Sequence, residues 1–257
     1  RPVAVGSPVG SIPTPEATFA SAQYRQTMDR RSYLRAGAAA AAAGATAGCL
    51  GGLFDRGPQN VVLPPPEDQL AESSSLAYPA YGESFPPFTL PNPFAEEPFS
   101  VADFEQPFLC TAFYAFCPAE CILLLNSFAK VQARLLERNR ADEIGLVAIT
   151  FDPERDTPEA LRTNADRRGI NYTHPMWYYL RPESAAAAKR VVEEQLGLAY
   201  EKIGDVNGDA YEFNHISITF LVNPDGVVER AYRGQQPDVA RLVDDSLTVQ
   251  DAYGSDT

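Results

Sequence analysis

The chain of 257 residues carries 34 acidic but only 21 basic side chains, a formal net charge of −13 at pH 7. Nucleic acid is therefore excluded as an expected partner, because phosphate binding needs a basic surface. Lysine occurs only at Lys130, Lys189 and Lys202. An acidic, lysine-poor surface is typical of halophilic proteins, although an ordinary acidic exported domain has the same composition.

An export signal is predicted at residues 28–48, where paired arginines lead into an Ala/Gly run. This is the pattern of a twin-arginine signal, and it is too short and too weakly apolar to predict a membrane span. Cys49 follows in a Thr-Ala-Gly-Cys sequence like a lipoprotein box, so we expect it to carry lipid. The alternative is an Ala-rich surface helix with a buried cysteine. Residues 1–27 are expected to be an untranslated or disordered extension.

The rest of the chain divides into a linker, a domain and a tail. Residues 49–85 are rich in Pro, Gly, Ser and acidic residues, a linker composition that suits a tether between a lipid anchor and a folded domain. We therefore expect the folded domain to span residues 86–250. Residues 251–257 are expected to be a disordered tail.

The first half of this domain predicts a short hairpin, two buried strands and a helix between the strands. The hairpin comprises residues 86–90 and 97–101, and the continuous apolar runs 108–116 and 144–151 predict the strands. Between these two strands, residues 120–138 have a helical period. Their apolar stripe consists of Leu124, Leu125, Phe128, Val131 and Leu135.

The second half continues the alternation of strands and helices. Thr157 and Pro158 predict the cap and first residue of a helix that stops at Gly169. Asn223–Gly226 is a turn signal between two strands. The remaining predicted elements are strands at 176–180, 216–222 and 227–232 and helices at 184–196 and 237–247. The order predicts an α/β fold, a three-layer α/β/α domain.

Two cysteines and a distant histidine form the strongest candidate site. Cys117 and Cys121 are four residues apart, so they share one face of a helical turn. Cys117 falls where a buried strand gives way to a helix N-terminus, which favours a thiolate. With His215, expected at the start of the strand 216–222, the pair would make a soft site suited to Cu(I) or Zn(II). The two thiols could equally work as a redox pair.

Other reactive side chains predict less. Cys110 lies inside a buried strand and is expected to be a core residue, too far along the strand for a disulfide to Cys117. His174 and the acidic stretch 205–209 are expected to be loop residues without a metal. The carboxylates of Glu120, Asp152 and Asp156 are expected either to orient the cysteine loop or a partner, or to lie on the solvated surface.

Four segments together resemble the SCO/SenC family of thioredoxin-like copper proteins. They are the hairpin and strand of residues 88–116, the Cys-Pro-Ala-Glu-Cys motif of 117–121, the Asp-Pro segment of 149–158 and the histidine segment of 215–226. The resemblance covers about residues 86–248. It departs from the family pattern at Phe116, which is often polar in the family, at Ile122, where the family usually has proline, and at Cys110, which is unusual in the family.

The resemblance implies a thioredoxin-like fold and copper ligation by Cys117, Cys121 and His215. It implies a metallochaperone that delivers copper to the binuclear copper centre of a cytochrome oxidase subunit. The export signal and Cys49 predict that this protein is lipid-anchored on the outer face of the cytoplasmic membrane. The alternative is an enzyme, a thiol–disulfide oxidoreductase in which Cys117 attacks and Cys121 resolves the mixed disulfide. His215 distinguishes the two functions, because a dedicated oxidoreductase does not need it.

Overall fold

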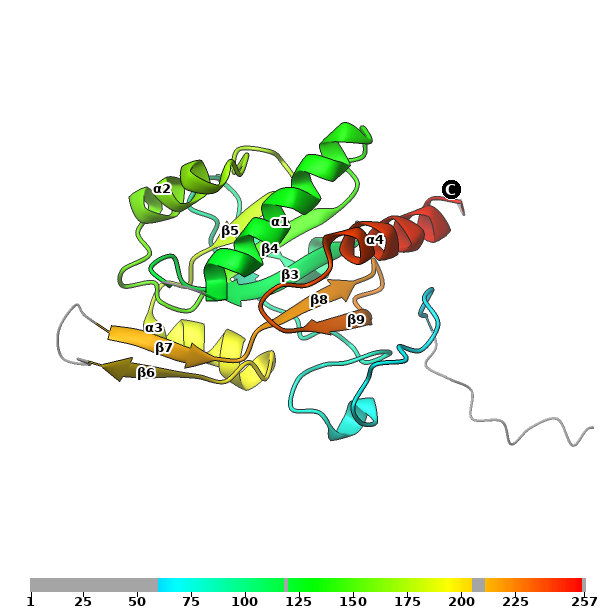
Figure 1. Ribbon diagram of the computed structural model, residues 1–257, viewed down its shortest axis with the longest axis horizontal. Helices are drawn as coiled ribbons and strands as arrows, with labels where there is room; N and C mark the ends of the chain where they lie inside the picture. Colours follow the sequence, from blue (N-terminus) through cyan, green and yellow to red (C-terminus); the bar gives the residue numbers. More distant parts are fainter. Residues whose placement is uncertain (1–59, 118–119, 205–210, 256–257) are drawn as a thin grey trace, which may run out of the picture. The chain divides into compact units, whose positions relative to one another are not determined.

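A five-stranded sheet lies at the centre of the domain, with the strands in the order β5-β4-β3-β8-β9 (Figure 1). The computed structural model describes residues 60–117, 120–204 and 211–255. The strands β3, β4 and β5 are parallel, whereas β8 runs antiparallel to both β3 and β9. Their bounds are β3 (Phe108–Phe113), β4 (Gly145–Thr150), β5 (Trp177–Leu180), β8 (Ile218–Val222) and β9 (Val228–Arg233).

Continuous apolar runs form the middle of the sheet, as the sequence predicts. Every residue of β3, β4 and β8 is buried, which is usual for strands covered on both faces. The strand β3 ends at Phe113, before the predicted end at residue 116, because the chain turns there. In this turn the backbone N–H of Cys117 donates to the carbonyl of Tyr114 at 3.4 Å. The turn leads directly to the cysteine pair.

Helices flank the sheet. The helices α1 (Glu120–Glu137) and α4 (Val239–Gly254) lie next to each other on the near face in Figure 1. The predicted apolar stripe of α1 is confirmed, since all five of its members are buried. The helix α4 extends to Gly254, beyond the predicted end at 247 and into the segment 251–257 that the sequence predicts to be a tail. None of the helices in the described ranges is long and apolar enough to cross a bilayer.

Local signals set the ends of α2 (Pro158–Arg168) where the sequence predicts them. The side chain of Thr157 accepts the backbone N–H of Ala160 at 3.2 Å, and Gly169 ends the helix with a φ of 66°. The next predicted helix starts at its cap, Ser184, as α3 (Ala185–Ala188). It continues as the π-helix η3 (Lys189–Gln195).

The segment before the first hairpin packs on the sheet, although its composition predicts a linker up to residue 85. Leu63 and Phe85 are buried there. The buried carboxylate of Glu229 on β9 accepts the backbone N–H groups of Val62 and Leu63, each at 2.9 Å. From residue 60 onward this segment is therefore part of the folded domain. It contains the 3₁₀ turn η1 (Ser73–Ser75) and leads to β1 (Thr89–Leu90), which pairs with β2 (Phe99–Ser100) as predicted and is followed by a second 3₁₀ turn, η2 (Val101–Asp103).

The strands β6 (Tyr200–Gly204) and β7 (Tyr211–His215) form a second hairpin that the sequence does not predict. His215 is the last residue of β7 and pairs with Tyr200 across this ribbon. The expectation that His215 opens the following strand is therefore wrong, since β8 begins only at Ile218. The rest of the prediction is confirmed, because the domain is a mixed α/β structure with a central sheet flanked by helices.

Candidate metal centre

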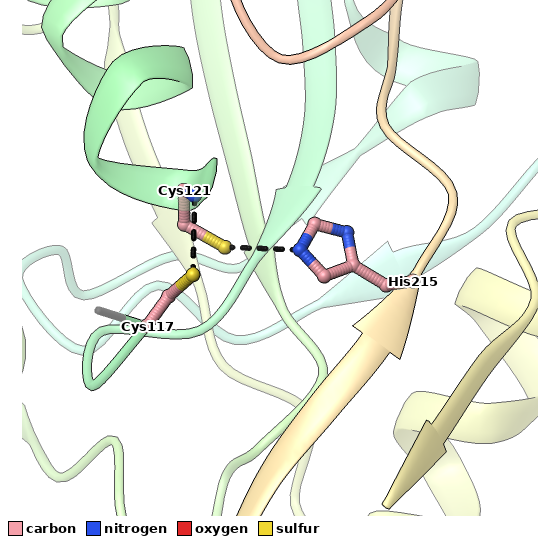
Figure 2. Close-up of side chains that lie close together, drawn as sticks. All are labelled: Cys117, Cys121 and His215. Atoms are coloured by element: carbon pink, nitrogen blue, oxygen red, sulfur yellow. Dashed lines mark hydrogen bonds between the residues drawn. The ribbon is translucent and has the colours of Figure 1, made fainter. Parts of the chain in front are cut away.

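Three side chains from distant parts of the chain meet at one end of the sheet. Cys117 ends the turn after β3, Cys121 lies in the first turn of α1, and His215 ends β7. Their ligand atoms all lie within 4.8 Å of one another, and Figure 2 shows the imidazole pointing toward the two sulfurs. Among the described residues this is the only group of three or more His, Cys, Asp or Glu side chains able to hold a metal ion.

Short contacts connect the three donors. The backbone N–H of Cys121 donates to Sγ of Cys117 at 3.2 Å, and Nε2 of His215 lies 3.4 Å from Sγ of Cys121 (Figure 2). The first contact places an N–H group of the helix N-terminus on the Cys117 sulfur, which favours its thiolate form. Burial, and then the neighbouring Cys117, raise the pKa of Cys121. The metal-free site therefore keeps Cys121 as a thiol.

Aromatic rings and a hydroxyl surround the imidazole of His215. Its Nδ1 atom lies 3.5 Å from Oγ of Ser217, which leaves Nε2 for the sulfur side. The ring of Phe151 lies 5.3 Å from the imidazole, centroid to centroid, and that of Tyr114 lies 6.2 Å away. The Tyr114 hydroxyl accepts the backbone N–H of Phe213 at 3.3 Å. The hairpin that carries His215 is thus hydrogen-bonded to the turn that carries Cys117.

Hydrogen bonds connect the buried part of the Asp-Pro segment to the turn that carries Cys117. Asp156 is fully buried, and its two carboxylate oxygens accept the backbone N–H of Ala115 at 2.9 and 3.1 Å. The hydroxyl of Thr150 donates to the same carboxylate. Burial, partly offset by these hydrogen bonds, raises the pKa of Asp156 to about 7. Of the two predicted roles for this carboxylate, the solvated surface is wrong and orientation of the loop fits.

Arg155 connects the Asp-Pro segment to the second hairpin. Its Nε donates to the buried carboxylate of Asp152 at 2.5 Å, and its Nη1 donates to the carbonyl of Tyr211 at 2.8 Å. The guanidinium also lies 3.5 Å from the centroid of the Tyr211 ring and 5.4 Å from that of Phe116. Asp152 is therefore buried and paired, not solvated. Arg155 lies within the Asp-Pro segment, but the sequence pattern does not indicate that its side chain reaches residue 211.

The other predicted candidates lie elsewhere. Cys110 is buried in the middle of β3, and burial raises its pKa, as expected for a core thiol. His174 lies 3.6 Å from the carboxylate of Asp142, away from the three donors. Cys49, the stretch 205–209 and the side chain of Glu120 fall outside the described residues.

Two surface hollows flank the centre. One, which we call the thiol groove, has a volume of about 600 Å³ and lies between α1 and α2. A second hollow, of about 590 Å³, is lined by His215 and Ile216. The residues of the thiol groove used below are Phe116, Cys117, Ile122, Glu159, Arg167 and Arg168. Cys117 lines the groove with 7% of its surface exposed, so this hollow is the side from which an incoming group would reach it.

The fold and the site together define a class of protein. A cysteine pair at the start of the helix that follows the central strand is the arrangement of a thioredoxin-like protein. The imidazole next to the pair adds a third soft donor, and two thiolates with one imidazole suit Cu(I) or Zn(II) better than hard cations. The donor set therefore fits copper.

Comparisons with known proteins agree with this class. The SCO1/SenC family model matches residues 81–249. A SCO2-like protein of Rickettsia prowazekii is 31% identical over 111 residues, which are 43% of this chain and 50% of that protein. The chain thus spans about half the length of the curated relatives it matches.

Among solved structures, a SCO1/SenC family lipoprotein from Bacillus anthracis has a TM-score of 0.54 at 18% identity, covering 65% of this chain and 94% of that one. BsSco, a member of the Sco family of cytochrome c oxidase assembly proteins, has a TM-score of 0.54 at 20% identity, covering 68% and 96%. Copper-bound ScoI of Bradyrhizobium japonicum has a TM-score of 0.51 at 19% identity, covering 65% and 99%. These likenesses show the thioredoxin-like fold.

The chain belongs to the SCO1/SenC family, because the family model covers most of its described residues.

Proposed function

We propose that this protein is a copper chaperone, in which Cys117, Cys121 and His215 hold copper for delivery to the binuclear copper centre of a terminal cytochrome oxidase. The observation that carries the proposal is the approach of the three donor atoms to within 4.8 Å of one another. Copper-bound ScoI and the description of BsSco as an oxidase assembly protein support it.

The site is built for uptake coupled to proton release. Cys121 is a thiol in the metal-free state, so binding copper as a thiolate complex displaces its proton. His215 would bind through Nε2, with Ser217 at Nδ1. Three protein donors leave room for an incoming ligand, and the thiol groove provides its approach to Cys117. Ligand exchange with a partner sulfur can then transfer the ion without releasing it into water.

A thiol–disulfide reductase is the second candidate, favoured by the N–H···S hydrogen bond that stabilises a thiolate at Cys117. In that reaction the Cys117 thiolate attacks a partner disulfide, and one partner sulfur leaves as a thiolate. Cys121 loses its proton and attacks the mixed disulfide, so the partner leaves fully reduced and the pair becomes a disulfide. Two electrons pass to the partner, and an external thiol must later reduce the pair.

The location proposed for this activity is the outer face of the cytoplasmic membrane. The signal-like residues 28–48 and the lipobox-like Cys49 support an exported, lipid-anchored protein. The likeness of the fold to a lipoprotein of Bacillus anthracis agrees with it. Mass spectrometry of the protein from its native membrane tests the anchor, because a lipidated Cys49 would be the first residue and carry acyl groups.

An anaerobic Cu(I) titration against a competing chelator tests the copper proposal. We expect one Cu(I) per reduced wild-type chain, and a loss of affinity of at least about tenfold in His215→Ala. His174→Ala is the matched control, because it removes the only other histidine and lies outside the centre. A wild-type protein that takes up no copper, or equal losses in the two variants, would overturn the proposal. Reduction of a disulfide substrate by the same variants measures the second function separately.

A further inference from the structure

Exposed apolar side chains gather next to the three candidate ligands. Phe116, which precedes Cys117, is 55% exposed, and Ile216, which follows His215, is 42% exposed. Single exposed apolar residues are ordinary, but Phe116 and Ile216 each directly adjoin a candidate ligand, and this pair, which we call the apolar rim, is of the kind that partner proteins cover.

The thiol groove extends this rim into the cleft between α1 and α2. Phe116 and Ile122 contribute apolar surface, and Cys117 contributes its sulfur. Both cysteines are buried, but Cys117 is 7% exposed and lines the groove, whereas Cys121 is 1% exposed and does not line it. A partner sulfur that approaches the centre from this side therefore meets Cys117 first.

The groove carries a charge opposite to that of the whole protein. Arg167 and Arg168 line it together with a single carboxylate, that of Glu159. Within the described ranges neither arginine forms an ion pair. The Nε atom of Arg168 is buried without a hydrogen-bond partner among the described residues. In a chain of net charge −13, this groove is a local site for a carboxylate.

We propose that the apolar rim and the thiol groove dock a segment of a partner protein that presents a cysteine close to an acidic side chain. The partner sulfur reaches Cys117 while the carboxylate pairs with Arg167 and Arg168. The proposal rests on the proposed function in one respect, which is that the docked sulfur accepts copper from Cys117 or exchanges electrons with it. The preference for an acidic partner segment requires neither copper transfer nor electron exchange, and it is measured without copper.

The test compares two cysteine peptides that differ only in having two aspartates or two lysines beside the cysteine, each activated as a thiopyridyl disulfide. The full-length, metal-free Cys121→Ser protein is used, so that no second thiol resolves the adduct. The Cys117 sulfur forms a disulfide with the peptide sulfur, and pyridine-2-thione leaves. Peptide mass mapping counts the adduct at Cys117 and separates it from any at Cys49.

The measured quantity is the ratio of the rate constant for the aspartate peptide to that for the lysine peptide. The net charge of −13 alone would favour the lysine peptide, whereas the proposal predicts a ratio above one. In Arg167→Gln/Arg168→Gln we expect this ratio to fall on the order of fivefold. Arg162→Gln removes an exposed arginine of α2 outside the groove and should leave the ratio unchanged.

A ratio of one or less in the parent protein, or equal ratios in the double variant and in Arg162→Gln, would overturn the proposal. The apolar rim is tested with Phe116→Ser against Leu136→Ser, an exposed leucine near the far end of α1. We expect slower reaction of the aspartate peptide only in Phe116→Ser, and equal rates would exclude the rim. Because no copper is present, a failure here leaves the Cu(I) titration result untouched, and the reverse also holds.

Discussion

The carboxylate of Asp156 accepts the backbone N–H of Ala115 at 2.9 and 3.1 Å, across 41 positions of the chain. The side-chain amide of Asn164 donates to the carbonyl of the same Ala115 at 3.2 Å. The backbone N–H and carbonyl of Ala115, which lies two residues before Cys117, are therefore hydrogen-bonded to the Asp-Pro segment and to α2. The position of the cysteine turn depends on these contacts.

The raised pKa of Asp156, about 7, predicts how Asp156→Asn changes stability with pH. Between pH 4 and 7 the folded protein keeps a proton on Asp156 that the unfolded chain has lost, so the wild-type free energy of unfolding falls as pH rises. This contribution changes by up to about 1.4 kcal/mol per pH unit. Asparagine does not titrate and lacks this contribution. The free energy of unfolding of Asp156→Asn, relative to that of wild type, should therefore rise from pH 4 to 7 and stay level above pH 7.

Urea unfolding at several pH values measures this difference. The exposed Asp166→Asn, on α2, is the control and should show a nearly constant difference from wild type. A difference for Asp156→Asn that does not change with pH would contradict the assignment of a raised pKa to this carboxylate.

Replacing Arg155 by lysine should loosen the hairpin that carries His215. Lysine keeps the charge, but it lacks the planar group that reaches Asp152 and the Tyr211 carbonyl together. We expect faster amide exchange in residues 211–215 and Cu(I) binding weaker by about tenfold. Arg162→Lys is the control on the neighbouring helix. Unchanged exchange of β7 in Arg155→Lys would show that Arg155 does not position His215.

Two glycines with almost the same φ test whether the segment after residue 60 packs on the domain. Gly169 and Gly197 have φ values of 66° and 67°. A Cβ atom at Gly169 meets nothing within 4 Å, whereas one at Gly197 would lie 1.8 Å from the carbonyl oxygen of Ala77. We expect Gly169→Ala to cost about 1 kcal/mol of unfolding free energy, from backbone strain alone. Gly197→Ala should cost about 2–4 kcal/mol, because Ala77 must also move.

Thermal or urea unfolding of the two variants gives the comparison. Equal losses would mean that residues 60–85 do not press on the end of the π-helix, and that the linker predicted from composition is right after all.

Features fixed by neighbouring residues are predictable from this sequence. The cap of α2 depends on Thr157, Pro158 and Gly169, all close along the chain. The stripe of α1 follows from the helical period. The cysteine pair is also local, since Cys117 and Cys121 belong to one turn of the chain. For these features, propensity and periodicity agree with the tertiary structure.

Features that depend on distant partners are missed. The hairpin β6–β7 is a half-exposed ribbon, so it lacks the continuous apolar run that predicts β3 and β4. Because the sequence does not predict this hairpin, the prediction wrongly places His215 at the start of the following strand. Asp156 looks like a surface carboxylate because its partners, Thr150 and the Ala115 N–H, meet it only after folding. The segment at Val62 looks like a linker because Glu229, which binds it, is 167 positions away.

X-ray absorption spectroscopy of the Cu(I)-loaded protein tests whether Cys117, Cys121 and His215 bind copper together. We expect a copper shell of two sulfurs and one imidazole nitrogen in wild type and in His174→Ala. In His215→Ala the imidazole scattering should disappear while both sulfurs stay. A wild-type shell without imidazole, or an unchanged spectrum in His215→Ala, would show that His215 is not a copper ligand.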